Sequence, residues 1–278
     1  MKTVGIIGGK GIIGSFMAKF WRSHGFRVLI SDLRTKLSNK KLAQRSDVIV
    51  VSVPIHITKK VIREIAPILR RDQLLMDVTS LKIFPVQEML KSKASVIGLH
   101  PMFRPGSGGM RGQIMVMCPA RCTSAQKKWL RNLLKKGGAT VAEMTPKKHD
   151  ELMGIVQALI HFHSLVLGMT LRSLKTDLRA IMKVMSPIYR MQFDVVCRIF
   201  AQNPELYASI GMENPETKKI TAHFLESTKK LRQILTAKNI ASFVEEFSKT
   251  ARFLGPYSKK ALLESDELLT VFQKKHRL

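Results

Sequence analysis

The chain has 278 residues, of which 45% are hydrophobic and 24% are charged, and it contains no internal repeat and no low-complexity tract. This composition is typical of a globular protein, and the length allows one large domain or two ordinary ones. The formal net charge of +27 is extreme, and most of the excess lies before residue 146. Because the basic residues come in scattered pairs without interleaved aromatic residues, we expect a solvated lysine-rich surface and no nucleic-acid partner.

Short β-branched runs alternate with helical stretches up to about residue 145. Strands are expected at Thr3–Ile7, Arg27–Ile30, Val48–Val53, Leu74–Val78, Val96–Leu99, Ile114–Met117 and Thr140–Val141. Helices are expected between them at Ile12–His24, His56–Leu69, Val86–Lys91 and Ala125–Lys136. This alternation predicts an α/β fold, with a Rossmann-like, doubly wound and mostly parallel sheet in residues 1–146.

The first expected strand leads into a glycine-rich turn and then into a helix. The turn reads Gly9, Lys10, Gly11, Ile12, Ile13 and Gly14, a G-x-G-x-x-G motif. Gly9 allows a tight turn, Gly11 lets the backbone approach a pyrophosphate, and Gly14 permits close packing of helix on strand. The amide groups that begin the helix favour a bound phosphate. The motif therefore predicts a dinucleotide-binding site lined by the three glycines, Ile12 and Ile13.

An acidic residue follows the second expected strand. Asp32 is placed to accept hydrogen bonds from the adenosine ribose and to repel a 2′-phosphate. This favours NAD as the cofactor, whereas Arg34, two residues later, leaves NADP open.

Polar residues also follow later strands. Ser52 and Pro54 come after the third strand, Ser80 after the fourth and His100 at the end of the fifth. Ligands of open α/β sheets lie outside the carboxyl ends of the strands, so we expect these residues around the nicotinamide. Ser52 and Pro54 are accordingly predicted to bind the cofactor.

The N-terminus and the cysteines favour a cytoplasmic protein. The first residues run directly into an apolar stretch and have no small-residue cleavage site, so we expect no signal peptide. Cys118, Cys122 and Cys197 are an odd number without metal-ligand spacing. We expect reduced thiols and no bound metal.

Residues 147–278 are expected to be entirely helical. The pairs Ser186-Pro187, Asn203-Pro204, Asn214-Pro215 and Gly255-Pro256 mark places where helices start or stop. The segment Leu152–Leu171 has no charged residue over about the length that spans a bilayer, but it contains two histidines and other polar residues. We expect a helix buried on most sides rather than a membrane span, and a homodimer formed through this helical domain.

Several segments resemble one known family. They are Val51–Thr58 (VSVPIHIT), Gly98–Phe103 (GLHPMF), His149–Phe162 (HDELMGIVQALIHF), Ser186–Arg190 (SPIYR) and Phe200–Ile210 (FAQNPELYASI). In these segments the chain resembles the prephenate dehydrogenases, and most closely the dehydrogenase half of the bifunctional chorismate mutase/prephenate dehydrogenases. The resemblance covers essentially the whole chain, and we expect the mutase domain to be absent.

The resemblance implies an NAD-dependent oxidative decarboxylation of prephenate to 4-hydroxyphenylpyruvate in tyrosine biosynthesis. Ring carbon C4 gives a hydride to the nicotinamide while its hydroxyl becomes a carbonyl, and the ring carboxylate leaves as carbon dioxide. A neutral histidine suits the removal of the hydroxyl proton, because its ordinary pKa lies near working pH. The matching residue is His100.

The resemblance also implies roles for other residues. Ser80 is expected to orient His100 or the substrate hydroxyl, and Arg190 to grip a substrate carboxylate. His161 and Lys82 are implied to help bind the substrate, with His161 also matching a position tied to the tyrosine effector. His149 matches a family position to which we assign no role.

Two alternatives stay open. A related enzyme could take arogenate, in which an amino acid replaces the pyruvyl ketone, and motifs around His100 do not separate the two substrates. A non-catalytic dinucleotide-binding protein with nucleic-acid affinity would show steeply salt-dependent DNA binding without turnover. Arg104 departs from the family's usual pattern and places a bulky cation close to His100.

Overall fold

The computed structural model describes residues 2–106 and 109–276, which form two compact units. The first unit is drawn from Met1–Gln157 and Glu205–Glu216, and the second from Ala158–Pro204 and Thr217–Leu278. The chain therefore enters the helical unit, returns to the first unit for one short segment, and leaves it again.

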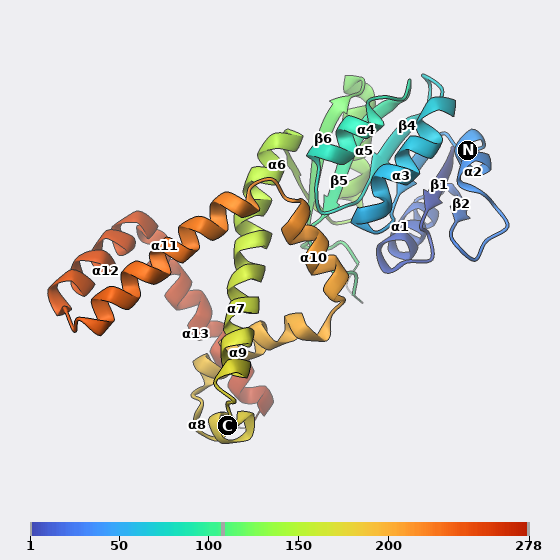
Figure 1. Ribbon diagram of the computed structural model, residues 1–278. Helices are drawn as coiled ribbons and strands as arrows, with labels where there is room; N and C mark the ends of the chain where they lie inside the picture. The colour runs from blue at the N-terminus through green and yellow to red at the C-terminus, as the bar shows by residue number, and fades with distance from the viewer. Residues whose placement is uncertain (1, 107–108, 277–278) are drawn as a thin grey trace. The chain divides into compact units, whose positions relative to one another are not determined.

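A seven-stranded sheet is the centre of the first unit (Figure 1). Its strands are β1 (Thr3–Ile7), β2 (Arg27–Ser31), β3 (Val48–Val51), β4 (Leu74–Asp77), β5 (Ser95–Pro101), β6 (Ile114–Arg121) and β7 (Thr140–Glu143). Their order across the sheet is β2-β1-β3-β4-β5-β6-β7, and only the β5–β6 pair is antiparallel. The prediction of a mostly parallel, Rossmann-like sheet is confirmed.

Helices cover both faces of the sheet (Figure 1). Helices α1 (Ile12–Ser23) and α5 (Ser124–Lys136) pack on one face, and α2 (Asn39–Gln44), α3 (Ile55–Ile65) and α4 (Ile83–Met89) on the other. Along β3, Val48 and Val50 join the first of these cores, while Ile49 and Val51 join the second. The strand is apolar throughout because both of its faces are buried.

The rest of the described chain is helical, as predicted. It contains α6 (Pro146–Met153), a π-helical segment (Gly154–Leu159), α7 (Ile160–Ser173), α8 (Leu178–Val184), α9 (Pro187–Cys197), a 3₁₀ turn (Arg198–Ala201), α10 (Pro204–Glu213), α11 (Thr217–Thr236), α12 (Ile240–Leu254) and α13 (Pro256–His276). Helices α9, α10 and α13 each begin with proline, which suits a first helical position because it has no amide hydrogen to satisfy.

The compact units do not divide at residue 146. Helices α6 and α10 belong with the sheet, where Ile210 of α10 packs with Ile55 and Leu81 in a small buried cluster. The side-chain amide of Asn214 also donates to the carbonyl oxygen of Asp150 at 3.2 Å. The first unit therefore includes helical segments that the sequence pattern assigned to the helical half.

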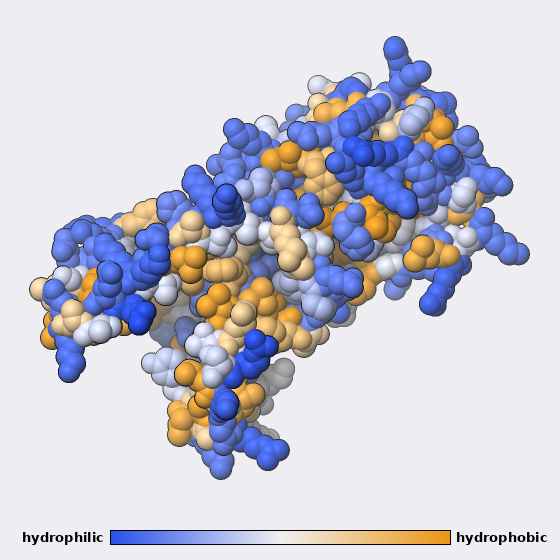
Figure 2. Space-filling model, in the orientation of Figure 1, coloured by the Kyte–Doolittle hydropathy of each residue, from blue (hydrophilic) through white to orange (hydrophobic). Residues whose placement is uncertain are grey.

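The apolar helix is more exposed than expected. By length and composition, the segment Pro146–Ser173 is long and apolar enough to cross a membrane. Core helices of soluble proteins can be equally long and apolar. Only 22% of the most apolar 18-residue stretch of this segment is buried. The expectation that this helix is buried on most sides is therefore not fulfilled within the single chain. Figure 2 shows apolar side chains gathered over α7–α9 on the face in view. The exposed large apolar residues of these helices include Ile160, Met169, Leu178, Val184 and Tyr189.

Candidate active site

The glycine-rich turn forms a cradle that side chains would close. Gly8 has φ of +80°, and a Cβ there would lie 2.2 Å from the carbonyl oxygen of Ser52. A Cβ on Gly14 would lie 2.2 Å from the carbonyl oxygen of Gly8. Gly11 is open, with its nearest neighbour at 3.4 Å. The tight turn is therefore made by Gly8, whereas the motif predicted it at Gly9. Gly9 instead lies against the Ile30 side chain.

The start of α1 completes this cradle. Gly11 is the N-cap residue and contributes no side chain, so the first amide groups of the helix are left accessible. Ile12 is 61% exposed beside them, whereas Ile13 packs onto the core. Backbone amides and the positive end of a 12-residue helix fit the pyrophosphate of a dinucleotide.

The carboxylate of Asp32 is held in a fixed orientation at the end of β2. Its Oδ2 accepts the backbone N–H of Lys10 at 2.9 Å, and its Oδ1 accepts the N–H of Leu33 at 2.9 Å. The Lys10 ammonium donates to the carbonyl oxygen of Arg34 at 3.1 Å. The acidic side chain thus borders the glycine cradle, as expected for a group that binds ribose hydroxyls.

The predicted strand-end residues share one edge of the sheet. Strands β1 to β5 are parallel, so their carboxyl ends face the same side. Ser52 is tied to β1 by its N–H, which donates to Ile7 at 2.8 Å, and Pro54 begins α3 as its N-cap. Ser80 is partly exposed beyond β4, and His100 lies at the end of β5. The structure therefore brings these four residues to the edge that carries the glycine cradle.

His100 is the first member of a buried chain of three side chains. Its Nδ1 lies 2.8 Å from Nε2 of His149, and Nδ1 of His149 lies 2.7 Å from Oδ1 of Asp150. The Asp150 carboxylate also accepts the backbone N–H groups of Lys82, at 2.8 Å, and Ile83, at 2.9 Å. His100 is 4% exposed, His149 0% and Asp150 1%.

Burial keeps this histidine pair uncharged. It lowers the pKa of His100 well below the usual 6.5, and repulsion from the Lys82 ammonium and from His149 in its protonated form acts in the same direction. Burial also lowers the pKa of His149, although the hydrogen bond to Asp150 opposes that shift. A neutral His100 can accept a proton at neutral pH.

Lys82 lies inside the sheet unit beside an acidic partner. Its side chain is fully buried, and its ammonium donates to Oδ2 of Asp77, which is fully buried as well. Thr79 donates to the same oxygen through its N–H at 3.0 Å and its hydroxyl at 2.5 Å. The ammonium thus has a partner inside the sheet unit, and substrate binding by Lys82 stays a prediction.

Arg190 and His161 lie in the helical unit. Nε of Arg190, on α9, donates to both carboxylate oxygens of Asp194 at 3.1 and 3.2 Å. The Arg190 side chain is 30% exposed. His161 is partly buried in the first turn of α7. Arg104 is exposed in the loop after β5, in the sheet unit.

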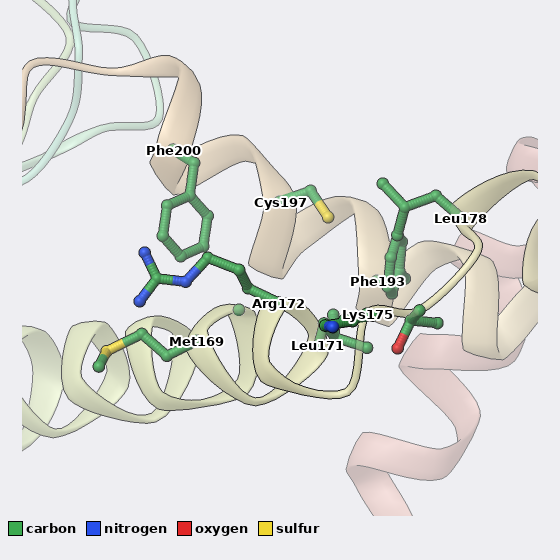
Figure 3. Close-up of a pocket in the computed structure, with 10 residues that line it drawn as sticks. Met169, Leu171, Arg172, Lys175, Leu178, Phe193, Cys197 and Phe200 are labelled. Carbon is green, nitrogen blue, oxygen red and sulfur yellow. The ribbon is translucent and has the colours of Figure 1, made fainter.

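The helical unit also has a hollow of about 650 Å³ (Figure 3). Figure 3 shows Arg172 and Phe200 at one end and Leu178 and Phe193 at the other. Gly168 lets Phe200 pack against α7, since a Cβ there would lie 2.3 Å from the Phe200 ring. The lining is mostly apolar, which fits a domain surface built for contact with another apolar surface.

Comparison with known proteins identifies the family. Residues 8–143 match the model for the nucleotide-binding domain of prephenate dehydrogenase, and residues 145–249 match the model for its dimerization domain. The T-protein of Enterobacter agglomerans is 32% identical over 270 residues, covering 97% of this chain and 72% of that protein. The chain belongs to the prephenate dehydrogenase family. The resemblance inferred from the GLHPMF and related segments is thereby confirmed.

Other members of the prephenate dehydrogenase family carry different substrate names. A probable arogenate/prephenate dehydrogenase of Methanocaldococcus jannaschii is 35% identical over 285 residues. That match covers 95% of this chain, which spans 64% of the relative's length. Among solved structures, Aquifex aeolicus prephenate dehydrogenase with hydroxyphenyl propionate and NAD+ superposes with a TM-score of 0.71 at 20% identity, covering 92% of this chain and 99% of that one. Synechocystis arogenate dehydrogenase superposes with a TM-score of 0.71 at 18% identity, covering 92% of this chain and 99% of that one. These two structures support the fold.

Proposed function

We propose that the chain oxidises prephenate with NAD to 4-hydroxyphenylpyruvate and carbon dioxide. The observation that carries this proposal is a buried, neutral histidine, His100, at the sheet edge that also holds a dinucleotide cradle. A neutral base beside a nicotinamide is what the oxidation of a hydroxyl requires. The name of the A. aeolicus relative, solved with NAD+, supports the choice of cofactor.

The nucleotide-binding residues orient the cofactor. NAD, when bound, supplies the nicotinamide ring that accepts the hydride. Gly11 and the first amides of α1 hold the pyrophosphate, and Asp32 accepts hydrogen bonds from the ribose hydroxyls. Ser52 and Pro54, at the end of β3, border the nicotinamide side of the cradle.

His100 acts as the base. Its ring takes the proton from the C4 hydroxyl of the substrate as C4 loses its hydride and becomes a carbonyl carbon. The bond to the ring carboxylate then breaks, carbon dioxide leaves, and the electron pair makes the ring aromatic with a phenolate oxygen on C4. That oxygen takes a proton back to give the hydroxyl of the product. Ser80, at the neighbouring strand end, orients the hydroxyl or the His100 ring.

Arg190 and His161 are the residues that the family resemblance matches to substrate binding. Arg190 binds a carboxylate, since a guanidinium can donate two parallel hydrogen bonds and so fixes orientation as well as charge. His161 contributes to substrate or effector binding. The exposed apolar surfaces of α7–α9 favour a homodimer formed through this unit, consistent with the dimerization-domain match at residues 145–249. We propose that this dimer works in the cytoplasm.

The second candidate substrate is arogenate, favoured by the name of the M. jannaschii relative. The reacting ring is the same in both compounds, so the residues around His100 serve either one. The basic surface remains compatible with nucleic-acid contact, but the presence of the base and the cradle together favours an enzyme.

The test follows NADH formation by the whole chain with prephenate and, separately, with arogenate. His100→Asn is expected to lower kcat by about 10²–10⁴-fold while NAD still binds. His223→Asn, on an exposed part of α11, is the matched control and is expected to behave as wild type. Absence of NADH with both substrates would overturn the proposal, and salt-dependent DNA binding without turnover would favour the non-catalytic alternative.

A further inference from the structure

We propose that His149 and Asp150 are positioning residues that hold His100 in the tautomer whose Nε2 carries the free lone pair. The inference rests on the proposed function, because that lone pair is the one that would take the substrate proton. It also makes a statement about the free protein, which can be tested without any substrate.

The first step is the set of hydrogen bonds at Asp150. An ionised carboxylate only accepts hydrogen bonds. Its two oxygens accept the N–H groups of Lys82 and Ile83 at 2.8 and 2.9 Å, so the carboxylate is fixed in place. The nitrogen 2.7 Å from Oδ1 is Nδ1 of His149, and that nitrogen must therefore carry a hydrogen.

The hydrogen on Nδ1 of His149 determines where the hydrogen of His100 lies. A neutral imidazole with a hydrogen on Nδ1 has a bare Nε2. The bare Nε2 of His149 lies 2.8 Å from Nδ1 of His100, and one hydrogen must lie between the two nitrogens. His100 therefore donates from Nδ1, and its own Nε2 is left bare. The orientation of one carboxylate thus determines the tautomer of a histidine two side chains away.

Burial makes this chain of hydrogen bonds effective. All three side chains are at most 4% exposed, so bulk water does not compete for the ring nitrogens. Within the described part of the chain, the other charged or titratable groups that act on them are Lys82, Asp77 and Cys118. Lys82 is paired with Asp77, and Asp150 is the anion directly hydrogen-bonded to the rings.

The same chain supports the protonated state formed in the reaction. The O–H bond of the substrate breaks and an N–H bond forms at Nε2 of His100, giving a cation in a dry environment. That cation still donates from Nδ1 to His149, which in turn donates to the Asp150 carboxylate. The negative charge is thus coupled to the developing positive charge through two hydrogen bonds.

Two substitutions of His149 separate its two contacts. In His149→Gln, the side-chain oxygen reaches roughly the position of Nε2 and can accept from His100. In His149→Asn, the amide reaches only the position of Nδ1 and can donate to Asp150 but not contact His100. We expect His149→Asn to lower kcat by about 100-fold, and His149→Gln by about 10-fold or less. The KM for the substrate and the Kd for NAD should change by less than about 3-fold in both.

A readout on the wild-type chain keeps the test independent of how these variants fold. Nitrogen NMR of protein labelled at histidine reports which ring nitrogen of His100 carries the hydrogen, with His100→Asn used to assign the signal. The expected result is a hydrogen on Nδ1 and a bare Nε2. A hydrogen on Nε2 in the free protein would overturn the inference, as would a kcat for His149→Asn within about 2-fold of wild type.

The outcomes also distinguish this inference from the proposed function. If the tautomer is as expected but neither prephenate nor arogenate yields NADH, the proposed function fails and the positioning of His100 stands. If NADH forms with the wild type but His149→Asn and His149→Gln lose kcat equally, the enzyme stands and the contact from His149 to His100 is not what positions the base.

Discussion

Replacing Lys82 by methionine tests whether this lysine is a structural cation or a substrate ligand. The ammonium and the Asp77 carboxylate form an ion pair whose side chains are both 0% exposed. Methionine keeps most of the aliphatic volume but removes the charge, so the carboxylate loses its counter-ion in a site that water does not reach. The expected effect is on the stability of the sheet unit and not on the binding of prephenate.

The size of the effect follows from the partners that Asp77 keeps. Removing one member of a buried ion pair costs about 3–5 kcal/mol. Thr79 still donates to Asp77 through its N–H at 3.0 Å and its hydroxyl at 2.5 Å, so the lower end, about 3 kcal/mol, is expected. At about 2–4 °C per kcal/mol, the Tm should fall by about 6–12 °C. Adding Asp77→Asn should restore at least half of the loss, because the uncompensated charge is gone.

The assays are urea unfolding, thermal melting and steady-state kinetics with prephenate. Lys93→Met, at an exposed position, is the matched control and should change the free energy of unfolding by less than about 0.5 kcal/mol. Because Lys82 lowers the pKa of His100, its removal should also move the acidic limb of the pH–rate profile upwards. An unchanged Tm together with a tenfold rise in KM would refute the reasoning and return Lys82 to the substrate site.

Three further predictions concern the cradle, the base and the thiols. Gly14→Ala would place a Cβ 2.2 Å from the Gly8 carbonyl oxygen and should reduce both Tm and NAD affinity. Gly11→Ala, whose Cβ would have no neighbour nearer than 3.4 Å, should reduce NAD affinity alone. Calorimetric measurement of Tm and of NAD binding distinguishes the two variants. The pKa of His100 is lowered in the folded state, so below about pH 6.5 the unfolded chain binds more protons than the folded chain. The free energy of unfolding should therefore fall as the pH is lowered. If it falls equally in His100→Asn, His100 does not cause this pH dependence. Burial raises the pKa of the Cys118 thiol to about 12, so a thiol-specific disulfide reagent should modify the two partly exposed cysteines and spare Cys118 until the protein unfolds; three fast-reacting thiols would contradict its burial.

The strands could be predicted from the sequence because burial leaves a direct mark on composition. All seven expected strands are present, and the buried run Val48–Val51 is apolar at every position. Helix α2 (Asn39–Gln44) was missed, since it is short, lysine-rich and stabilised by the hydroxyl of Ser38, which accepts from Lys41. The π-helical segment Gly154–Leu159 was also not predicted, because its residues continue an ordinary helical pattern.

The candidate site was only partly predictable, for a physical reason. Strand-end positions follow from chain order, which is why His100 and Ser80 could be placed at one edge of the sheet. The contact between His100 and His149 joins residues 49 apart, and no local spacing reports it. The burial of Lys82 could not be predicted from the sequence either, because no sequence pattern indicates that Asp77 is its partner.

The return of α10 to the sheet unit has a consequence for the order in which the protein matures. The sheet and the nucleotide cradle are complete once β7 ends at Glu143. The support for His100 is added by His149 and Asp150, and the amide that holds the Asp150 backbone comes from Asn214, 64 residues further along. A nascent chain can therefore form the glycine cradle long before the hydrogen bonds that reach His100 are complete. Fragments that stop before α6 are expected to hold nucleotide and remain silent in turnover.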